Sequence, residues 1–369
     1  MTAKPKILLI SQGDFSGVTP ALTAALRRAG CEVISGTQSL RELGLLRYPY
    51  GLWMKASARL IYGRDANLLL ERTYAAYVSR SRVSKALVDR HPDVDVVLLI
   101  NANSSNYRGR RPSRPRFALY TDYMNLLSKG LPDYGFQLDE RKTYPRWNSL
   151  EREALAEQDH IFVMGSHVKP ALELSYGVDP DKITVVGSGP GLDLDIVRDG
   201  QVKNTASRRI LFVGKLAEVK GLDVLLRAFP RVREIFPDAV LDVVTGKPVS
   251  GPGVVFHGNI DLSQLGNLFY SANVFAMPAY KEPLGLVFLE AMLSKAACIG
   301  TTTGSMPEII REGETGYLVQ PGDHIALAER ICDMLREPVR TQRMAELGYA
   351  SAKAYWHWDG VVQRMLARL

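Results

Sequence analysis

The chain has 369 residues, more than twice the usual size of one domain, so two domains are expected. Hydrophobic residues make up 46% and charged residues 23%, the ordinary balance of a globular protein with a core. No apolar run approaches the roughly 18 residues of a membrane-spanning helix. The opening MTAKPKILLISQG turns polar too early for a signal peptide and is expected to form a first strand.

The three cysteines argue against a disulfide framework or a zinc site. Cys31, Cys298 and Cys332 are odd in number, far apart and free of CxxC spacing. Such a set fits a reducing cytoplasm, which is the localisation that the sequence favours.

The net charge of +7 is unevenly distributed along the chain. Up to Arg116 there are 19 Lys and Arg against 8 Asp and Glu, a surplus of 11, so the rest of the chain is slightly acidic. A solvated surface is one interpretation of this surplus, because charge runs usually lie on such a surface. The alternatives are an anionic membrane surface, an acidic substrate or nucleic acid.

Apolar runs alternate with helical patterns through the first half. KILLIS (6–11) is typical of a strand buried on both faces, and after a Gly-containing turn ALTAALRRAG is expected to form a helix ending at Gly30. The further runs that we predict as strands are 31–35, 94–100, 116–122, 160–166 and 183–189. This alternation predicts a doubly wound parallel α/β sheet.

The pattern restarts after the polar stretch RDGQVKNTASRR (198–209), which we interpret as a linker. The runs predicted as strands of the second half are 210–216, 239–246, 254–259, 274–278 and 297–302. Two open α/β sheets facing each other would place the carboxyl ends of both sets of strands on one cleft, where such folds bind ligands.

A basic, aromatic segment separates the second and third predicted strands. LLRYPYGLWMKASARLIYG combines Trp53 with tyrosines and cations, as interfacial helices do, and one hypothesis is that it docks to an anionic membrane holding a lipid-linked acceptor. A helical cap that binds a soluble acceptor is the alternative. Further on, NYRGRRPSRPR (106–116) adds five arginines without an acid and is expected to be an exposed loop.

Two motifs in the second half carry the chemistry. In FVGKLAEVKG (212–221) a tight turn at Gly214 precedes a helix, and Lys215 and Lys220 there could form a diphosphate site. The alternative is that they are ordinary surface lysines. In KEPLGLVFLEAM (281–292) the Pro-Gly loop places Glu282 after a strand and Glu290 inside an apolar helix. A carboxylate buried at that position requires a partner, either a hydroxyl-rich ligand or a protein cation.

Taken together, these motifs resemble a known family. In order and spacing, FVGKLAEVKG, VVFHGNID, AMPAYKEPLGLVFLEAM and GSMPEIIREGETGYLVQPGD are similar to the C-terminal half of the family-four retaining glycosyltransferases of GT-B fold. In the N-terminal half, SYGVDPDKITVVGSGPGLD resembles the segment that leads into the interdomain linker. The tail AYWHWDGVVQRML resembles the family's last helix, which crosses back onto the N-terminal domain.

The resemblance implies a GT-B fold of two Rossmann-like doubly wound domains facing a central cleft. We expect an N-terminal acceptor-binding domain (1–197), a C-terminal nucleotide-sugar-binding domain (198–350) and a C-terminal helix (351–369). The implied activity is metal-independent transfer of a sugar, with retention of configuration, from a nucleotide-sugar donor to a hydroxyl of a glycan, a lipid-linked or a small-molecule acceptor. No cofactor and no nucleic acid are implied.

The resemblance also assigns roles to individual residues. Lys220 would grip the diphosphate, Glu282 the donor sugar, and Glu290 the ribose hydroxyls. The implied donor-binding residues are Gly13, Gly17, Gly214, Lys215, Lys220, Glu282, Leu284, Gly285 and Glu290. The implied catalytic residues are Lys220, Glu282 and Asp122, and the acceptor-binding residues are Tyr123, Arg108 and Arg111.

The chain departs from the family's pattern at several positions. Asp122 and Tyr123 stand where members commonly carry His, and Asp122 is assigned either to sugar or acceptor binding or to a structural role. Lys215 replaces the more usual Arg and loses its bidentate fork. Two further readings stay open: a nucleotide-sugar epimerase of the same fold, and a basic membrane- or nucleic-acid-binding protein without catalysis.

Overall fold

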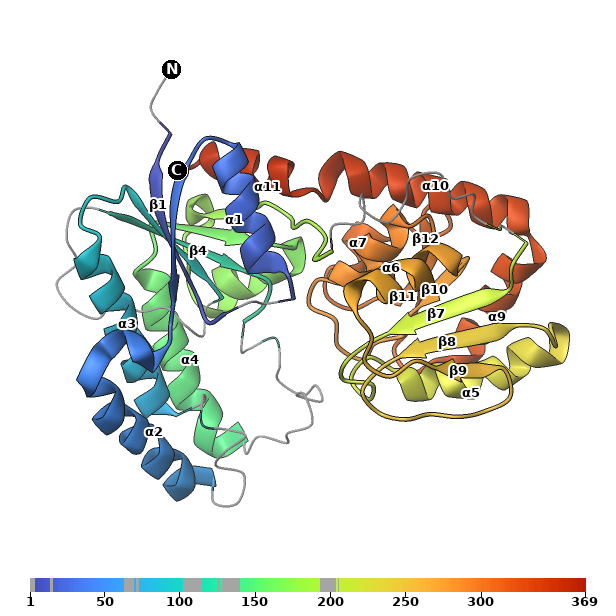
Figure 1. Ribbon diagram of the computed structural model, residues 1–369, viewed down its shortest axis with the longest axis horizontal. Helices are drawn as coiled ribbons and strands as arrows, with labels where there is room; N and C mark the ends of the chain where they lie inside the picture. The colour runs from blue at the N-terminus through green and yellow to red at the C-terminus, as the bar shows by residue number, and fades with distance from the viewer. Residues whose placement is uncertain are drawn as a thin grey trace. The chain divides into compact units, whose positions relative to one another are not determined.

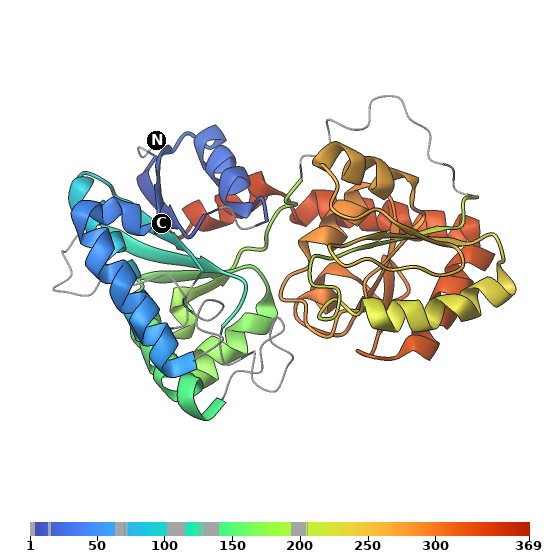
Figure 2. The same cartoon turned by 60° about the horizontal axis from the view of Figure 1, so that its bottom comes forward.

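The computed structural model describes residues 4–13, 16–62, 70, 73–101, 115–124, 127, 140–192, 204 and 206–369, with only the backbone at 62 and 140–147. They form two compact units, each built on one parallel sheet with helices (Figures 1 and 2). The first unit runs to Gly187 and includes Trp358–Leu369, and the second runs from Ser188 to His357. The predicted fold class of two Rossmann-like domains is confirmed.

The sheet of the first unit has six parallel strands in the order β2-β1-β3-β4-β5-β6. Its central strands are buried on both faces, as their unbroken apolar runs predict. The strands are β1 (Lys6–Ser11), β2 (Glu32–Thr37), β3 (Val96–Ile100), β4 (Arg116–Thr121), β5 (His160–Val163) and β6 (Ile183–Val185).

Helices of the first unit connect and cover these strands. They are α1 (Val18–Arg28), η1 (Leu40–Leu46), α2 (Arg47–Tyr62), α3 (Tyr74–Arg90), α4 (Glu140–Ala156), η6 (Ser166–Val168), η7 (Ala171–Ser175), η8 (Pro180–Lys182) and α11 (Trp358–Leu366). The last helix, α11, lies beside α1 (Figure 1), where Asp359 pairs with Arg28 at 2.7 Å. Arg364 of α11 donates from Nε to the carbonyl of Val186 at 2.8 Å, which ties the chain's end to this unit.

The second unit has a sheet of the same design, in the order β12-β11-β10-β7-β8-β9. Every strand pairing within it is parallel. The strands are β7 (Arg209–Val213), β8 (Val240–Val244), β9 (Val254–Phe256), β10 (Val274–Ala276), β11 (Ala297–Thr301) and β12 (Gly316–Val319). The helices are α5 (Leu222–Ile235), α6 (Leu262–Ser271), α7 (Leu286–Leu293), α8 (Met306–Ile309), α9 (His324–Arg336) and α10 (Pro338–Tyr355).

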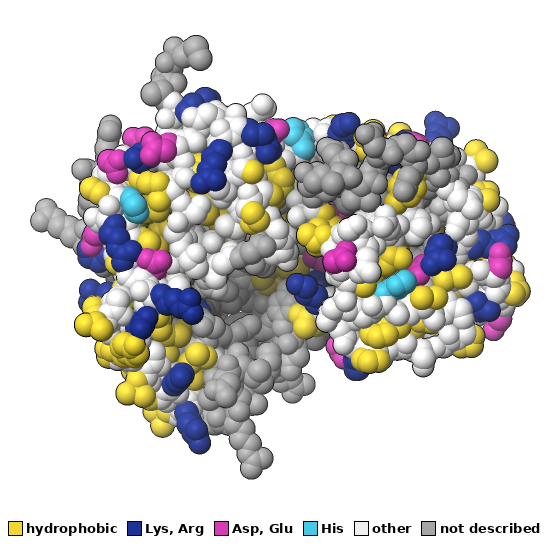
Figure 3. Space-filling model, viewed as in Figure 1, with side chains coloured by type: hydrophobic (Ala, Val, Ile, Leu, Met, Phe, Trp, Pro, Cys, Tyr) yellow, Lys and Arg dark blue, Asp and Glu magenta, His cyan; other side chains and the backbone are white. Residues whose placement is uncertain are grey.

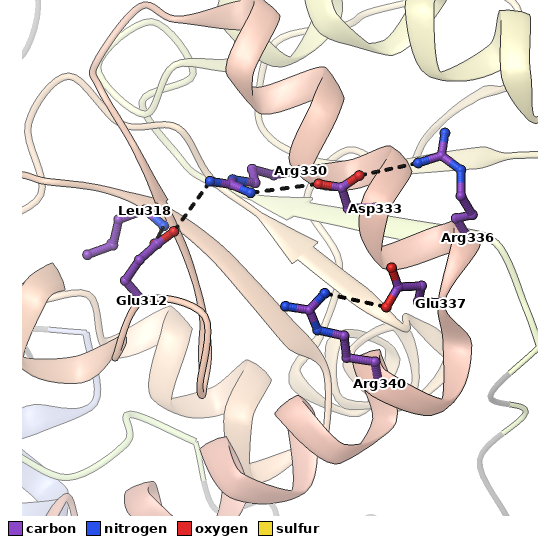
Figure 4. A network of polar contacts seen from close by, with 7 residues as sticks. All are labelled: Glu312, Leu318, Arg330, Asp333, Arg336, Glu337 and Arg340. Carbon is purple, nitrogen blue, oxygen red and sulfur yellow. Dashed lines mark hydrogen bonds and ion pairs between the residues drawn. The ribbon is translucent and has the colours of Figure 1, made fainter.

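A polar network fastens α9 to the turn before β12 (Figure 4). Arg330 lies 3.7 Å from both Glu312 and Asp333, and Glu312 also accepts the backbone N–H of Leu318 at 2.6 Å. These side chains are about half exposed, so the network contributes little to stability and mainly orients α9 relative to the turn.

The predicted strands all form, and the differences lie at the ends of elements and in one additional strand, β12. Helix α1 begins at Val18, three residues before the predicted start, because Pro20 fits the first turn of a helix, where its missing N–H costs nothing. Strand β12 was not predicted, since its four residues lie between the turn-forming stretches EGET (312–315) and QPGD (320–323). No described helix has the length and apolar composition that crossing a bilayer requires.

Candidate active site

The strand order of the second unit fixes where a ligand is expected. From β7 the chain proceeds outward through β8 and β9, and then crosses to β10, β11 and β12 on the other side. The order therefore reverses between β7 and β10. In open α/β sheets the crevice at the carboxyl ends of such a pair of strands is the usual binding position. The loops that leave β7 and β10 hold the two motifs singled out from the sequence.

The loop after β7 closes tightly against β10. Gly221, which caps α5, has a φ of 73°, and a Cβ added to it would lie 1.9 Å from the carbonyl oxygen of Pro278. Only glycine permits both this left-handed conformation and this approach. The carbonyl of Val219 in turn accepts the backbone N–H of Tyr280 at 3.0 Å. The two loops are thus fixed against each other through their backbones.

Lys220 and Glu282 form an ion pair between these loops. The Nζ of Lys220 lies 2.9 Å from Oε2 of Glu282, and the exposed fractions of the two side chains are 16% and 9%. Gly214 leaves room for the lysine, since a Cβ there would meet the Lys220 stem at 3.1 Å. The structure therefore brings together two of the predicted donor-site residues, and it pairs them with each other.

The Pro-Gly loop is held from a third side by the turn after β11. A Cβ on Gly304 would lie 1.9 Å from the carbonyl oxygen of Glu282, and the N–H of Ser305 donates to the carbonyl of Pro283 at 3.2 Å. Gly285 caps α7 with a φ of 91°. The carboxylate of Glu282 is consequently placed by backbone contacts on both sides of its loop.

Glu290 is buried in α7, where its carboxylate accepts the backbone N–H groups of Gly191 and Leu192. Burial raises the pKa of the Glu290 carboxyl to about 8, and these two hydrogen bonds oppose the rise only in part. Gly191 and Leu192 belong to the segment with which the chain enters the second unit. The partner of this carboxylate in the structure is therefore the protein backbone. The sequence analysis had expected either a ligand or a protein cation.

The remaining donor-site candidates of this unit lie in the same loops. Lys215 is exposed, and Leu284 is 3% exposed between Glu282 and Gly285. In the part of the chain that the structure describes, no three His, Cys, Asp or Glu side chains are grouped to hold a metal ion.

The glycines predicted in the first unit follow β1 at its carboxyl end. Gly13 has a φ of 131° and its carbonyl accepts the hydroxyl of Thr19 at 3.0 Å, while Gly17 caps α1 with a φ of 80°. This turn lies where the strand order of the first sheet reverses, between β1 and β3. Their place agrees with a ligand-binding turn, and their role stays a prediction.

The acceptor-site candidates are only partly described. Asp122 is buried at the end of β4, and Tyr123 follows it with its hydroxyl donating to the carbonyl of Leu127. Arg108 and Arg111 lie outside the described residues.

Several residues that shape the site were missed by the sequence interpretation. Tyr280 donates its hydroxyl to Asp223 at 3.0 Å and so joins the loop after β10 to α5. Gly221, Gly304 and Gly191 act through backbone contacts with distant segments. Gly221 and Gly304 have positive φ, which favours glycine but leaves no pattern of spacing in a sequence. Gly191 contributes a backbone N–H, which nearly every residue type carries.

A cavity of about 220 Å³ lies elsewhere, at the amino ends of β7 and β10. Its lining includes Arg208, Asn273 and Pro338, and its polar groups are satisfied locally, with Arg208 paired to Asp238 at 2.7 Å. We place the candidate site at the opposite edge of the sheet, because the ion pair and the closely packed glycines are there.

Residues 207–337 match the protein family described as "Glycosyl transferases group 1". The expected resemblance to the family-four glycosyltransferases of GT-B fold is confirmed for this part of the chain. Among curated proteins, D-inositol 3-phosphate glycosyltransferase from Streptomyces scabiei is 29% identical over 239 residues, 57% of this chain and 53% of that protein. The chain thus spans about half the length of this curated relative.

Solved structures resemble the chain along nearly its whole length. Sucrose-phosphate synthase from Thermosynechococcus elongatus has a TM-score of 0.72 at 18% identity, covering 98% of this chain and 97% of that one. HepE of Anabaena, solved in complex with UDP and glucose, has a TM-score of 0.67 at 16% identity, covering 99% and 100%. At such identity the similarity establishes the fold.

The close contact at Gly221 predicts a large cost for adding a side chain. Gly221→Ala should lower the free energy of unfolding by clearly more than the roughly 1–2 kcal/mol of a left-handed alanine, because the methyl group displaces the Pro278 carbonyl. Gly313→Ala is the matched control, since Gly313 has a φ of 74° and nothing within 4 Å of an added Cβ. Urea unfolding measures both variants, and equal costs would contradict the tight packing of these loops.

The raised pKa of Glu290 predicts a pH dependence of stability. The folded protein holds this proton up to a pH of about 8, whereas the unfolded chain releases it near 4.5. The free energy of unfolding that the bound proton contributes is therefore lost as the pH rises between these values. Glu290→Gln should keep the amide oxygen as an acceptor and abolish this loss. Between pH 5.5 and 8.5 the free energy of unfolding of the wild type should fall, relative to that of the variant, by on the order of 3 kcal/mol.

Urea unfolding at several pH values tests this difference. The exposed Glu234 of α5 provides the control, since Glu234→Gln should keep the wild-type profile. Parallel profiles for the wild type and Glu290→Gln would show that the carboxyl is ionised throughout and would refute the assignment.

Proposed function

We propose that the chain is a glycosyltransferase that moves a sugar from a nucleotide-sugar donor to a hydroxyl group of an acceptor. The observation that carries the proposal is the Lys220–Glu282 ion pair, which lies where the strand order of the second sheet reverses, between β7 and β10. Glu290 lies in the helix that follows Glu282, about one turn after its first residue, Leu286. The family match over 207–337 covers the same loops.

The proposed donor site assigns one part of the nucleotide sugar to each side chain. Lys220, with Lys215 of the same loop, neutralises the diphosphate, and the first N–H groups of α5 add donors. Glu282 accepts hydrogen bonds from hydroxyls of the sugar. Glu290 accepts hydrogen bonds from the ribose hydroxyls, and its two backbone partners leave lone pairs free for them.

The proposed mechanism is retaining and needs no metal or cofactor. Cleavage of the bond between the sugar and the diphosphate leaves negative charge on the phosphate, and the lysines stabilise this charge as it develops. The acceptor hydroxyl attacks from the same face and gives its proton to the leaving phosphate oxygen. The configuration of the sugar is therefore kept.

The first unit is proposed to bind the acceptor. Gly13 and Gly17 allow a close backbone approach, and Asp122, Tyr123, Arg108 and Arg111 are the proposed contacts. UDP is the first nucleotide to test because HepE was solved with it, and a phosphate-bearing acceptor is suggested by the name of the Streptomyces relative. We propose a cytoplasmic protein that attaches peripherally to the inner face of the membrane.

The alternatives receive less support. The curated relative reported above is named a glycosyltransferase, and no observation favours an epimerase of the same fold. A binding protein without catalysis would leave the paired Lys220 and Glu282 without a reason.

The proposal is tested with UDP-, GDP-, ADP- and dTDP-sugars in a thermal-shift panel, followed by turnover with the donor that binds. At 100 times its dissociation constant a donor should stabilise the protein by about 2.7 kcal/mol. Lys220→Ala should weaken donor binding about 10- to 100-fold, the value of a charged hydrogen bond. Because that variant leaves Glu282 buried and unpaired, Lys220→Met/Glu282→Leu is measured beside it to separate lost binding from lost stability.

The pair of Lys247 and Glu218 supplies the control. They lie 2.6 Å apart in the same unit but are about 70% exposed, so Lys247→Ala should leave donor binding unchanged. Product from the wild type should keep the donor's anomeric configuration and should form in the presence of a chelator. Failure of every nucleotide sugar to bind would overturn the proposal, an inverted product would overturn retention, and loss of turnover with chelator would overturn metal independence.

A further inference from the structure

Helix α2 and the end of η1 before it present large apolar side chains to solvent. Single exposed apolar residues are ordinary, but a contiguous set of them marks an interaction surface. The exposed fractions are 85% for Leu45, 58% for Leu46, 62% for Tyr48, 71% for Leu52, 40% for Trp53, 89% for Leu60 and 42% for Ile61.

The opposite side of α2 anchors the helix to the first unit. Met54 and Ala58 are buried, and Met54 packs with Ala75 and Ala76 at the start of α3. Trp53 lies at the margin of this contact, with its ring edge-on to Tyr74 at a centroid distance of 6.4 Å. The helix is therefore anchored through one face. The apolar side chains of its outer face are exposed, so packing within the protein does not account for them.

Cations accompany the apolar residues in a regular way. Tyr48, Leu52 and Leu60 are spaced by multiples of four residues and form one row along α2. Lys55 and Arg59, also four residues apart, form the neighbouring row. Residues four apart share one side of a helix, so the two rows run next to each other. In Figure 3, hydrophobic and basic side chains are interspersed at the lower left, where Figure 1 places α2.

We propose that this face, α2 with Leu45 and Leu46, docks the protein onto an anionic lipid bilayer, with the helix axis along the surface. The apolar row would enter the boundary between headgroups and acyl chains, and Lys55, Arg59 and Arg47 would meet the lipid phosphates. The α2 sequence RYPYGLWMKASARLIY contains no acidic residue, so nothing on it repels such a surface.

A second copy of the chain fits this face less well. A twofold contact through this face would bury the cations of both copies in one interface, and α2 has no acidic residue to pair with them. The docking proposal rests on the peripheral attachment proposed above and names its surface, but it is independent of the proposed glycosyl transfer, because lipid binding is measured without donor or acceptor. Failure of one therefore leaves the other standing.

The test is co-sedimentation of the full chain with vesicles at low salt. Vesicles of phosphatidylcholine alone are compared with vesicles that contain about 30% phosphatidylglycerol, which gives a negative surface potential. We expect binding only to the anionic vesicles. Lys55→Gln/Arg59→Gln should lower the partition coefficient about 25-fold, from roughly fivefold for each cation.

The apolar row is tested separately with Leu52→Ser/Leu60→Ser. This variant should bind at least about tenfold more weakly, and salt should abolish what remains, since only the charge attraction is left. Leu174→Ser is its control, because Leu174 is also 85% exposed but lies in η7. Arg227→Gln/Arg340→Gln, two exposed arginines of the second unit, matches the charge change of the basic variant. Both controls should bind as the wild type does.

Three results would overturn the proposal. The first is no binding of the wild type to anionic vesicles at low salt. The second is binding that both α2 variants retain but Arg108→Gln/Arg111→Gln loses, which would move the contact to the arginine-rich loop. The third is a dimer in light scattering that Leu52→Ser/Leu60→Ser dissociates, without vesicle binding, which would make the face an interface between copies. All substituted α2 residues are exposed, so circular dichroism should show an unchanged fold.

Discussion

Burying the ammonium group of Lys220 beside the carboxylate of Glu282 removes both charges from most of their water, and the candidate site depends on how this cost is met. The two groups come from loops 62 positions apart in the chain. They meet at 2.9 Å because Gly221 allows the first loop to touch the carbonyl of Pro278, and Gly304 supports the second loop from its other side. A buried pair is a weak source of stability but places its charges accurately. A diphosphate that binds there would exchange one partner of the lysine for another.

Glu290 extends this arrangement toward the start of the second unit. Its carboxyl is buried, holds its proton to a pH of about 8 and accepts two backbone N–H groups from Gly191 and Leu192. The helix that carries it begins at Gly285, directly after the loop that carries Glu282. The proposed sugar site, the proposed ribose site and the segment at 191–192 are thus connected through one short stretch of the sequence. A ligand that contacts both glutamates would engage all three.

The sequence was sufficient to predict what depends on local pattern. Unbroken apolar runs predicted the strands of both sheets, except for the four residues of β12, and the Pro-Gly loop correctly placed Glu282 before a helix and Glu290 within it. The contacts between distant segments were beyond such reasoning. Nothing in the pattern indicates that Glu290 meets Gly191, or that Gly304 lies against Glu282, because these approaches are set by the three-dimensional packing of loops. The same holds for α2, whose composition indicated an interfacial helix, while its outward-facing leucines became evident only from the fold.

The central claim is that a nucleotide diphosphate binds at the carboxyl ends of β7 and β10. Amide hydrogen–deuterium exchange with and without UDP, or whichever nucleoside diphosphate binds most tightly, tests it directly. Exchange should slow in peptides covering residues 214–222 and 279–293, and should stay unchanged around 206–209 and 338–341, which line the cavity at the other edge of the sheet. Protection confined to that cavity, or absent from both loops while the nucleotide is bound, would contradict the account.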